Sequence, residues 1–327
     1  MSEAGSEASV YVATHRESAA ALGRQLADLI DDPENFVTVL RRELRELSDS
    51  AYVHSVERVR PGTGSDLSVR GPLLAAAQRP LRRALGESSA ASALSLAQRL
   101  AQCEERELRI FALPCLDRSI GEDPERTWQA MRQIARRAGD WTEIDALAEM
   151  WAKGVLAEPF RWAELEQLAY SQRVMERRLV GATLARMTRI LPHTRRHTLR
   201  GAASRRALEL LHQLIGDSEP MVQKALSWAL REWSDVDPSS VRQFLLEESS
   251  IALRHGDGNR AWVLRDALSR QPPEVSSELK HRLSGVRRSP DGPSTSIAAG
   301  QAAAFAPAVE AHGTVAQQGD RYTRSRP

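Results

Sequence analysis

Apolar residues recur every three to four positions along most of the chain, which is the spacing that places them on one face of an α-helix. Short clusters of Gly, Pro, Asp and Ser interrupt this pattern. Alternating runs of Val, Ile and Thr are absent, so no strand is predicted. The pattern predicts helices over residues 19–30, 36–47, 68–85, 92–118, 124–138, 141–156, 162–170, 174–190, 205–215, 221–236, 241–252, 261–269 and 274–283.

Successive helices of about 12–18 residues joined by short turns are typical of a repeat protein. We therefore expect an all-α fold, an α-solenoid of HEAT-like helix pairs, curved around a concave basic groove. No regular sequence period is visible, so a compact, non-repetitive helical bundle is the alternative. The helical domain is expected over residues 16–287, between a disordered start (1–15) and a disordered tail rich in Ala, Gly, Pro and Ser (288–327).

Two helix starts carry clear local signals. Asp123 precedes Pro124, which combines a side chain suited to the N-cap with a proline suited to the first helical position. Gly139 ends that helix, and Asp140 is placed to cap the next one, which begins at Trp141. Pro80 and Pro114 fall inside apolar-periodic stretches, so we expect a kink or a boundary at each.

Composition limits the classes of protein to which the chain can belong. The chain has 327 residues, and its two cysteines, Cys103 and Cys115, predict a reducing compartment without disulfides. The absence of a C-x-x-C motif, of an apolar run of about 20 residues and of a signal sequence argues against structural zinc, membrane insertion and secretion. We expect a cytoplasmic monomer with no cofactor, metal or membrane partner.

Positive charge is concentrated in one part of a chain whose formal net charge is only +2. Residues 173–206 contain ten arginines and one acidic residue, Glu176. So dense a block favours contact with a polyanion such as nucleic acid, and the alternative is a solvated helix face with a basic loop. His193 and His197 share this block, but the neighbouring Pro192 and arginines make a metal pair unconvincing. The arginines of the block are 173, 177, 178, 186, 189, 195, 196, 200, 205 and 206.

Two predicted helices carry tryptophan beside charged residues. Trp141 and Asp145 are four residues apart and therefore share a helix face. Trp228 shares a face with Lys224 and Arg231, on the side opposite the apolar residues of its helix. A face that bears cations is not expected to pack into a core, so we predict that Trp228 lines a groove. Trp151 and Trp233 fall at other angles and are expected in the core, where most helical tryptophans lie.

Three segments resemble the DNA alkylation repair glycosylases built from HEAT-like repeats (the AlkD-like family). WTEID at 141–145 is similar to the family's Trp-x-x-x-Asp, and ERRLVGA at 176–182 resembles a helix start in the family. KALSWALREWSDVDP at 224–238 is similar to its Lys-Ala-x-x-Trp-x-Leu-Arg segment and is the most specific of the three. SVRGPLL at 68–74 and ERELRIFAL at 105–113 are weaker matches, and the resemblance spans roughly residues 65–270.

The resemblance implies roles for individual residues. Asp145 would be the catalytic carboxylate, with Trp141 and Trp228 as aromatic walls against the damaged nucleotide. Arg178 would hold a phosphate near the lesion. Lys224 and Arg231 would be further groove cations or helix-packing groups. From the basic block we add Arg177, Arg195 and Arg196 as predicted DNA contacts.

These residue types suit a defined reaction on double-stranded DNA. An N3- or N7-alkylated purine carries positive charge and leaves without a general acid, so the enzyme needs only to stabilise an oxocarbenium-like sugar. A carboxylate supplies that stabilisation, and indole faces add cation–π attraction. The predicted function is a monofunctional DNA glycosylase, and the alternative is a non-catalytic HEAT-like module that binds DNA or a protein. About ten residues around 188–205 are additional to the family pattern and would either extend the DNA contact or obstruct the groove.

Overall fold

Helices are the regular elements of the part of the chain that the computed structural model describes, which comprises residues 3–53, 66–191, 197–289 and 292–304. No strand occurs in these ranges, and the predicted all-α class is confirmed. The chain divides into two compact units, Met1–Ala157 and Glu158–Pro327, where the sequence analysis expects one domain over 16–287. Within the same ranges, no helix is long and apolar enough to cross a membrane.

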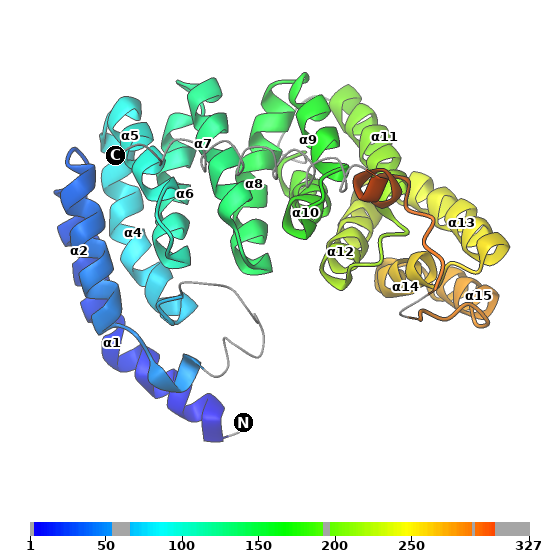
Figure 1. Cartoon of the computed structure of the whole chain (residues 1–327), viewed down its shortest axis with the longest axis horizontal. Coiled ribbons are helices and arrows are strands. Elements are labelled where there is room, and N and C mark those ends of the chain that lie inside the picture. The colour runs from blue at the N-terminus through cyan, green and yellow to red at the C-terminus, as the bar shows by residue number, and fades with distance from the viewer. Residues whose placement is uncertain (1–2, 54–65, 192–196, 290–291, 305–327) are drawn as a thin grey trace, which may run out of the picture. The chain divides into compact units, whose positions relative to one another are not determined.

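Unit 1 is a two-layer stack of helix pairs (Figure 1). Helices α4, α6 and α8 pack side by side in one layer, and α2, α5 and α7 form the other. Helix α1 covers α4 and also contacts α2. The elements are α1 (Glu3–Ala27), α2 (Pro33–Glu46), α4 (Gly71–Glu87), α5 (Ala90–Ala101), α6 (Arg106–Ser119), α7 (Pro124–Arg137) and α8 (Trp141–Ala157).

Unit 2 repeats this arrangement. Helices α10, α12 and α14 form one layer, and α9, α11, α13 and α15 form the other. Each unit therefore has the stacked helix pairs of the predicted α-solenoid, while the predicted curvature and concave basic groove stay predictions. The elements are α9 (Arg161–Ala169), α10 (Val174–Ile190), α11 (His197–Leu214), α12 (Pro220–Val236), α13 (Pro238–His255), α14 (Gly258–Ala267), the 3₁₀ turn η2 (Leu268–Arg270) and α15 (Pro273–Arg282).

The predicted helix starts at Asp123 and Asp140 are confirmed. Asp123 accepts a hydrogen bond from the backbone N–H of Arg126 at 3.2 Å, and Pro124 is the first residue of α7. Asp140 accepts from the backbone N–H groups of Thr142 at 2.6 Å and Glu143 at 3.0 Å. These bonds satisfy N–H groups that a helix start leaves without intrahelical partners.

The prediction of one helix over residues 92–118 is wrong. Two helices occupy this stretch, α5 and α6, with a break at residues 102–105 that contains neither Gly nor Pro. Arg109 stabilises the break because its Nη1 donates to the carbonyl oxygens of Cys103 at 3.0 Å and Glu104 at 2.6 Å. Pro114, expected as a bend or boundary, lies inside α6, and Pro80 lies inside α4.

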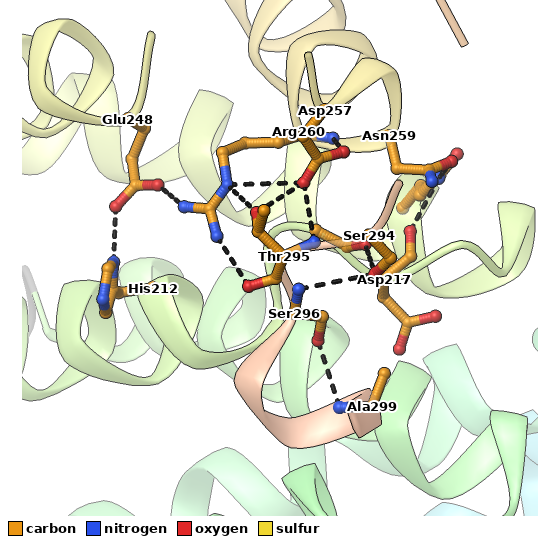
Figure 2. A network of polar contacts seen from close by, with 12 residues as sticks. His212, Asp217, Glu248, Asp257, Asn259, Arg260, Ser294, Thr295, Ser296 and Ala299 are labelled. Carbon is orange, nitrogen blue, oxygen red and sulfur yellow. Dashed lines mark hydrogen bonds and ion pairs between the residues drawn. The ribbon is translucent and has the colours of Figure 1, made fainter. Parts of the chain in front are cut away.

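Both ends of the helical region differ from the sequence expectation. Helix α1 begins at Glu3, inside the stretch that we expected to be disordered. Residues 292–304, part of the predicted disordered tail, lie against unit 2, where they contact Asp257 and Arg260 (Figure 2). They also contact Gly216. Residues 305–327 lie outside the described residues, so disorder there stays a prediction.

Candidate functional site

Trp141 and Asp145 lie one turn apart at the start of α8 in unit 1. Both side chains are half-buried, and both have partners within the structure. Asp140, only 2 % exposed, fixes the helix start directly before them. The local arrangement that the sequence predicts, with one indole and one carboxylate on a single helix face, is therefore present.

A buried ion pair anchors α8 from the neighbouring helix. Arg109 of α6 donates from Nε and Nη2 to the two carboxylate oxygens of Glu143, at 2.5 and 2.8 Å. Both side chains are almost completely buried. Two parallel N–H···O bonds fix direction as well as distance, so this pair sets the position of the first turn of α8, and with it Trp141 and Asp145.

A second arginine of α6 extends this network. Arg106, also buried, donates to Asp66 at 3.2 Å, to Glu107 at 2.9 Å and to the hydroxyl of Thr142 at 3.4 Å. It lies 3.5 Å from Asp140. The loop before α4 and the starts of α6 and α8 are thus held by one set of buried charges.

Burial and charge oppose each other at Glu143. Loss of solvent raises the pKa of Glu143, and the hydrogen bonds and charge of Arg109 act in the opposite direction. Burial is the largest single influence on Arg109 and lowers its pKa, but the hydrogen bonds and charge of Glu143, together with the charge of Asp140, raise the pKa overall. The charged forms of Arg109 and Glu143 therefore stabilise each other in this buried place.

Helix α12 in unit 2 presents the predicted mixed face. Lys224 is exposed, and Trp228 and Arg231 are half-buried. Trp228 donates from Nε1 to Glu232 at 3.2 Å. Trp233 is fully buried and donates to the carbonyl of Leu184 at 3.0 Å. Trp151 and Trp233 are buried, as predicted, whereas Trp228 is half-buried and its position in a groove stays a prediction.

The predicted DNA contact at Arg177 has a structural role instead. Its buried guanidinium donates to Asp217 at 2.7 Å and to the carbonyl oxygens of Ser171 at 2.8 Å and Gln172 at 3.2 Å. Asp217 in turn accepts from the backbone N–H of Glu219 just before α12. Because these donors are committed inside the protein, we leave Arg177 out of the proposed interface.

Two further predicted cations also have internal partners. Arg178 is 5 % exposed and donates to the carbonyl of Met221 at 2.6 Å, which ties α10 to the first turn of α12. Arg231 donates to Asp266 of α14 at 2.6 Å, which agrees with the helix-packing role considered for it. The predicted contacts Arg195 and Arg196 lie outside the described residues.

Sequence reasoning missed a repeated arginine role. Arg109 and Arg177 are each the fourth residue of a helix, and each binds the carbonyls five and six positions earlier. Each also pairs with an acid at the start of the next helix in the same layer, Glu143 or Asp217. The signal is an arginine 34 or 40 residues before an acid at or just before a helix start, which a search for a regular apolar period does not detect.

A cavity of about 670 Å³ lies between α11 and α13 of unit 2, lined by Leu208, His212, Phe244 and Glu248 among others. None of the candidate site residues lines it. Among the described residues, no group of three His, Cys, Asp or Glu side chains is arranged to hold a metal ion.

The family model for the DNA alkylation repair enzyme matches residues 40–270. The chain belongs to the DNA alkylation repair enzyme family. The match extends from α2 in unit 1 to η2 in unit 2 and includes Trp141, Asp145, Arg178, Lys224 and Trp228. No curated protein matches the chain significantly.

Family membership gives the candidate residues a common context, a DNA repair enzyme acting on DNA. Trp141 and Asp145 belong to unit 1, and Arg178, Lys224 and Trp228 belong to unit 2. That the residues of the two units line one groove stays a prediction. The fixed part of the candidate site is the start of α8 with its buried charges.

Proposed function

We propose that this DNA alkylation repair enzyme is a monofunctional DNA glycosylase that releases N3- and N7-alkylated purines. The observation that supports this most is the Trp141–Asp145 face of α8, held by the Arg109–Glu143 ion pair. Fixed charges stabilise a transition state best because they need no reorganisation during the reaction. A carboxylate anchored in this way suits the positive charge that develops on the deoxyribose.

In the proposed reaction the enzyme stabilises the sugar and does not need to protonate the base. The alkylated purine is already cationic, so breaking its N-glycosidic bond leaves a neutral base and an oxocarbenium-like sugar. Asp145 stabilises that sugar by charge and orients the attacking water. The water oxygen becomes the new hydroxyl at C1′, and its second proton is released to solvent. Trp141, on the same face of α8, offers an aromatic ring to the sugar cation at about 0.5–2 kcal/mol.

A base-release assay tests this function. Purified protein is incubated with methylated duplex DNA, and free 7-methylguanine and 3-methyladenine are measured by chromatography. We expect release of at least one of them, in proportion to the amount of protein. Binding of the DNA without release would instead support the non-catalytic DNA-binding alternative, and would refute the glycosylase proposal.

Trp228→Ala is expected to lower base release with little loss of stability. Trp228 is half-buried beside an exposed lysine, so its removal deletes an aromatic face without opening the core. One lost aromatic contact of ~0.5–2 kcal/mol corresponds to a roughly 2–30-fold slower reaction. Release rates and urea unfolding of the same preparation measure the two effects.

Trp233→Ala, on the same helix, is the matched control for this prediction. Trp233 is fully buried and hydrogen-bonded, so its truncation should cost about 3–5 kcal/mol of unfolding free energy. If Trp228→Ala destabilises the protein as much as Trp233→Ala does, Trp228 is a core residue and its assignment to the interface is wrong.

A further inference from the structure

Arg186 differs from the other arginines near Trp228 in how its donors are used. Arg177, Arg178 and Arg231 all donate to partners inside the protein. Arg186, on α10, lies with its guanidinium carbon 5.1 Å from the centroid of the Trp228 ring. Its Nε is buried and has no hydrogen-bond partner in the described part of the chain.

This environment fits a cation that is held in readiness for an anion. The cation–π contact with the indole holds the guanidinium of Arg186 beside Trp228. A buried donor without an acceptor is costly. Arg186 as a whole is only half-buried, so an anion bound at the rest of its guanidinium would offset that cost by charge. Glu232 is not the hydrogen-bond acceptor of Arg186 Nε. Its carboxylate accepts from Trp228 at 3.2 Å and lies 4.0 Å from Arg270.

We propose that Arg186 is the phosphate-binding arginine of α10, positioned by Trp228, and that it contacts the DNA backbone beside that tryptophan. This inference rests on the proposed function, since it assumes that Trp228 faces DNA. It reassigns the phosphate contact from Arg177 and Arg178, whose guanidinium groups are buried and have internal partners. A planar guanidinium suits two oxygens of one phosphate.

The test compares Arg186→Gln and Arg186→Lys with a control on the same helix, Arg189→Gln. Arg189 is exposed. The Arg189→Gln substitution therefore removes the same charge as Arg186→Gln without removing the contact with Trp228. Binding to unmodified duplex DNA is followed by fluorescence anisotropy over a salt series. Loss of one phosphate contact lowers the slope of log K against log salt by about one.

We expect Arg186→Gln to weaken binding roughly tenfold and to lose about one unit of salt slope. Arg186→Lys should keep the slope and lose part of the affinity, since it retains the charge without the planar fork. Wild-type slope and affinity in Arg186→Gln would overturn the inference, as would an equal effect of Arg189→Gln. No DNA binding by the wild type would refute the proposed function itself, so the two failures are distinguishable.

A separate observation concerns residues 292–304, here called the C-terminal strap, which lie beyond the residues that the family model matches. Figure 2 shows Thr295 at the centre of a polar network. Asp257 accepts from the N–H of Thr295 at 2.9 Å and from its hydroxyl at 2.5 Å. Arg260 donates to the hydroxyl of Thr295 at 2.8 Å and to its carbonyl at 3.1 Å.

The strap also contacts the end of α11 and the turn before α12. Ser294 donates to the carbonyl of Gly216 at 2.5 Å, and Ser296 donates to that of Gln213 at 3.2 Å. Gly216 leaves room for this contact, because a Cβ there would lie 2.6 Å from the nitrogen of Ser296. Ala298 and Ala302, on the short helix 297–304, are buried.

We infer that the C-terminal strap is an integral clamp of unit 2 that fixes the starts of α12 and α14. Asp257 and Arg260 are buried, so without Thr295 they lose hydrogen-bond partners in a poorly solvated place. Asp217 follows Gly216 directly in the chain. Its carboxylate accepts from Arg177 and from the backbone N–H of Glu219, just before α12. Packing of the C-terminal strap against unit 2 therefore stabilises the start of α12, the helix that carries Trp228.

Three variants test the clamp by thermal unfolding and by amide hydrogen exchange of α12. Ending the chain after Ala304 should change neither. Ending it after Arg288, or replacing Gly216 by Ala, should lower Tm by roughly 5 °C and speed exchange in the first turns of α12 and α14. A synthetic peptide of residues 289–304 should restore protection to the shorter chain but not to Gly216→Ala. Wild-type Tm and protection after truncation at Arg288 would refute the clamp.

Discussion

Asp145→Asn is expected to slow the release of alkylated purines by roughly 10²–10³-fold. The substitution keeps the size and shape of the side chain, removes its negative charge and turns one acceptor oxygen into an NH2 donor. Stabilisation of a developing cation by that charge would be lost, at ~2.7–4 kcal/mol in the transition state. Single-turnover release of 7-methylguanine from methylated DNA measures the effect without interference from product dissociation.

Glu149→Gln provides the matched control for this experiment. Glu149 is an exposed carboxylate one turn further along α8. Its substitution by Gln removes the same formal charge as Asp145→Asn. We expect its release rate and DNA affinity to stay near wild type. If Asp145→Asn and Glu149→Gln release base at equal rates, the negative charge at 145 has no special role and Asp145 is not catalytic.

Features that depend on neighbouring residues could be predicted from the sequence. The cap at Asp140, the shared face of Trp141 and Asp145, and the burial of Trp233 follow from helical geometry and from side-chain chemistry. The break at 102–105 was missed because it lacks Gly and Pro and is held by Arg109, a tertiary contact. Local propensity carries no information about such a contact.

The roles of the arginines show the limit of charge patterning. Ten arginines in 173–206 predict a polyanion surface, but Arg177 and Arg178 are buried and bonded to partners about 40 residues away. Asp217 and the carbonyl of Met221 become partners only through the packing of α10 on α12. A count of charges cannot separate structural arginines from those that remain for a ligand, whereas a count of satisfied donors can.

The other large effect is expected on stability, from Arg109→Ala. This variant leaves Glu143 buried without its partner and leaves the carbonyls of Cys103 and Glu104 without donors. Removing one member of a buried ion pair typically costs about 3–5 kcal/mol. Urea unfolding of the full chain, followed by circular dichroism, should show a midpoint lowered accordingly at neutral pH.

The loss in Arg109→Ala should shrink as the pH falls. Burial raises the pKa of Glu143 in the folded protein, and the variant lacks the arginine that opposes this shift. The folded state then binds a proton more readily than the unfolded state, so acidification through the raised pKa recovers stability. Unfolding free energies measured at neutral and at mildly acidic pH should therefore differ less between variant and wild type at the lower pH.

A double substitution separates the charge from the packing. Arg109→Met combined with Glu143→Leu removes both buried charges and keeps similar volumes, so it should be more stable than Arg109→Ala alone. The double variant should still lose base release, because α8 no longer has the two directional bonds that orient Trp141 and Asp145. Full activity in a stable double variant would show that the ion pair supports the fold without positioning the carboxylate.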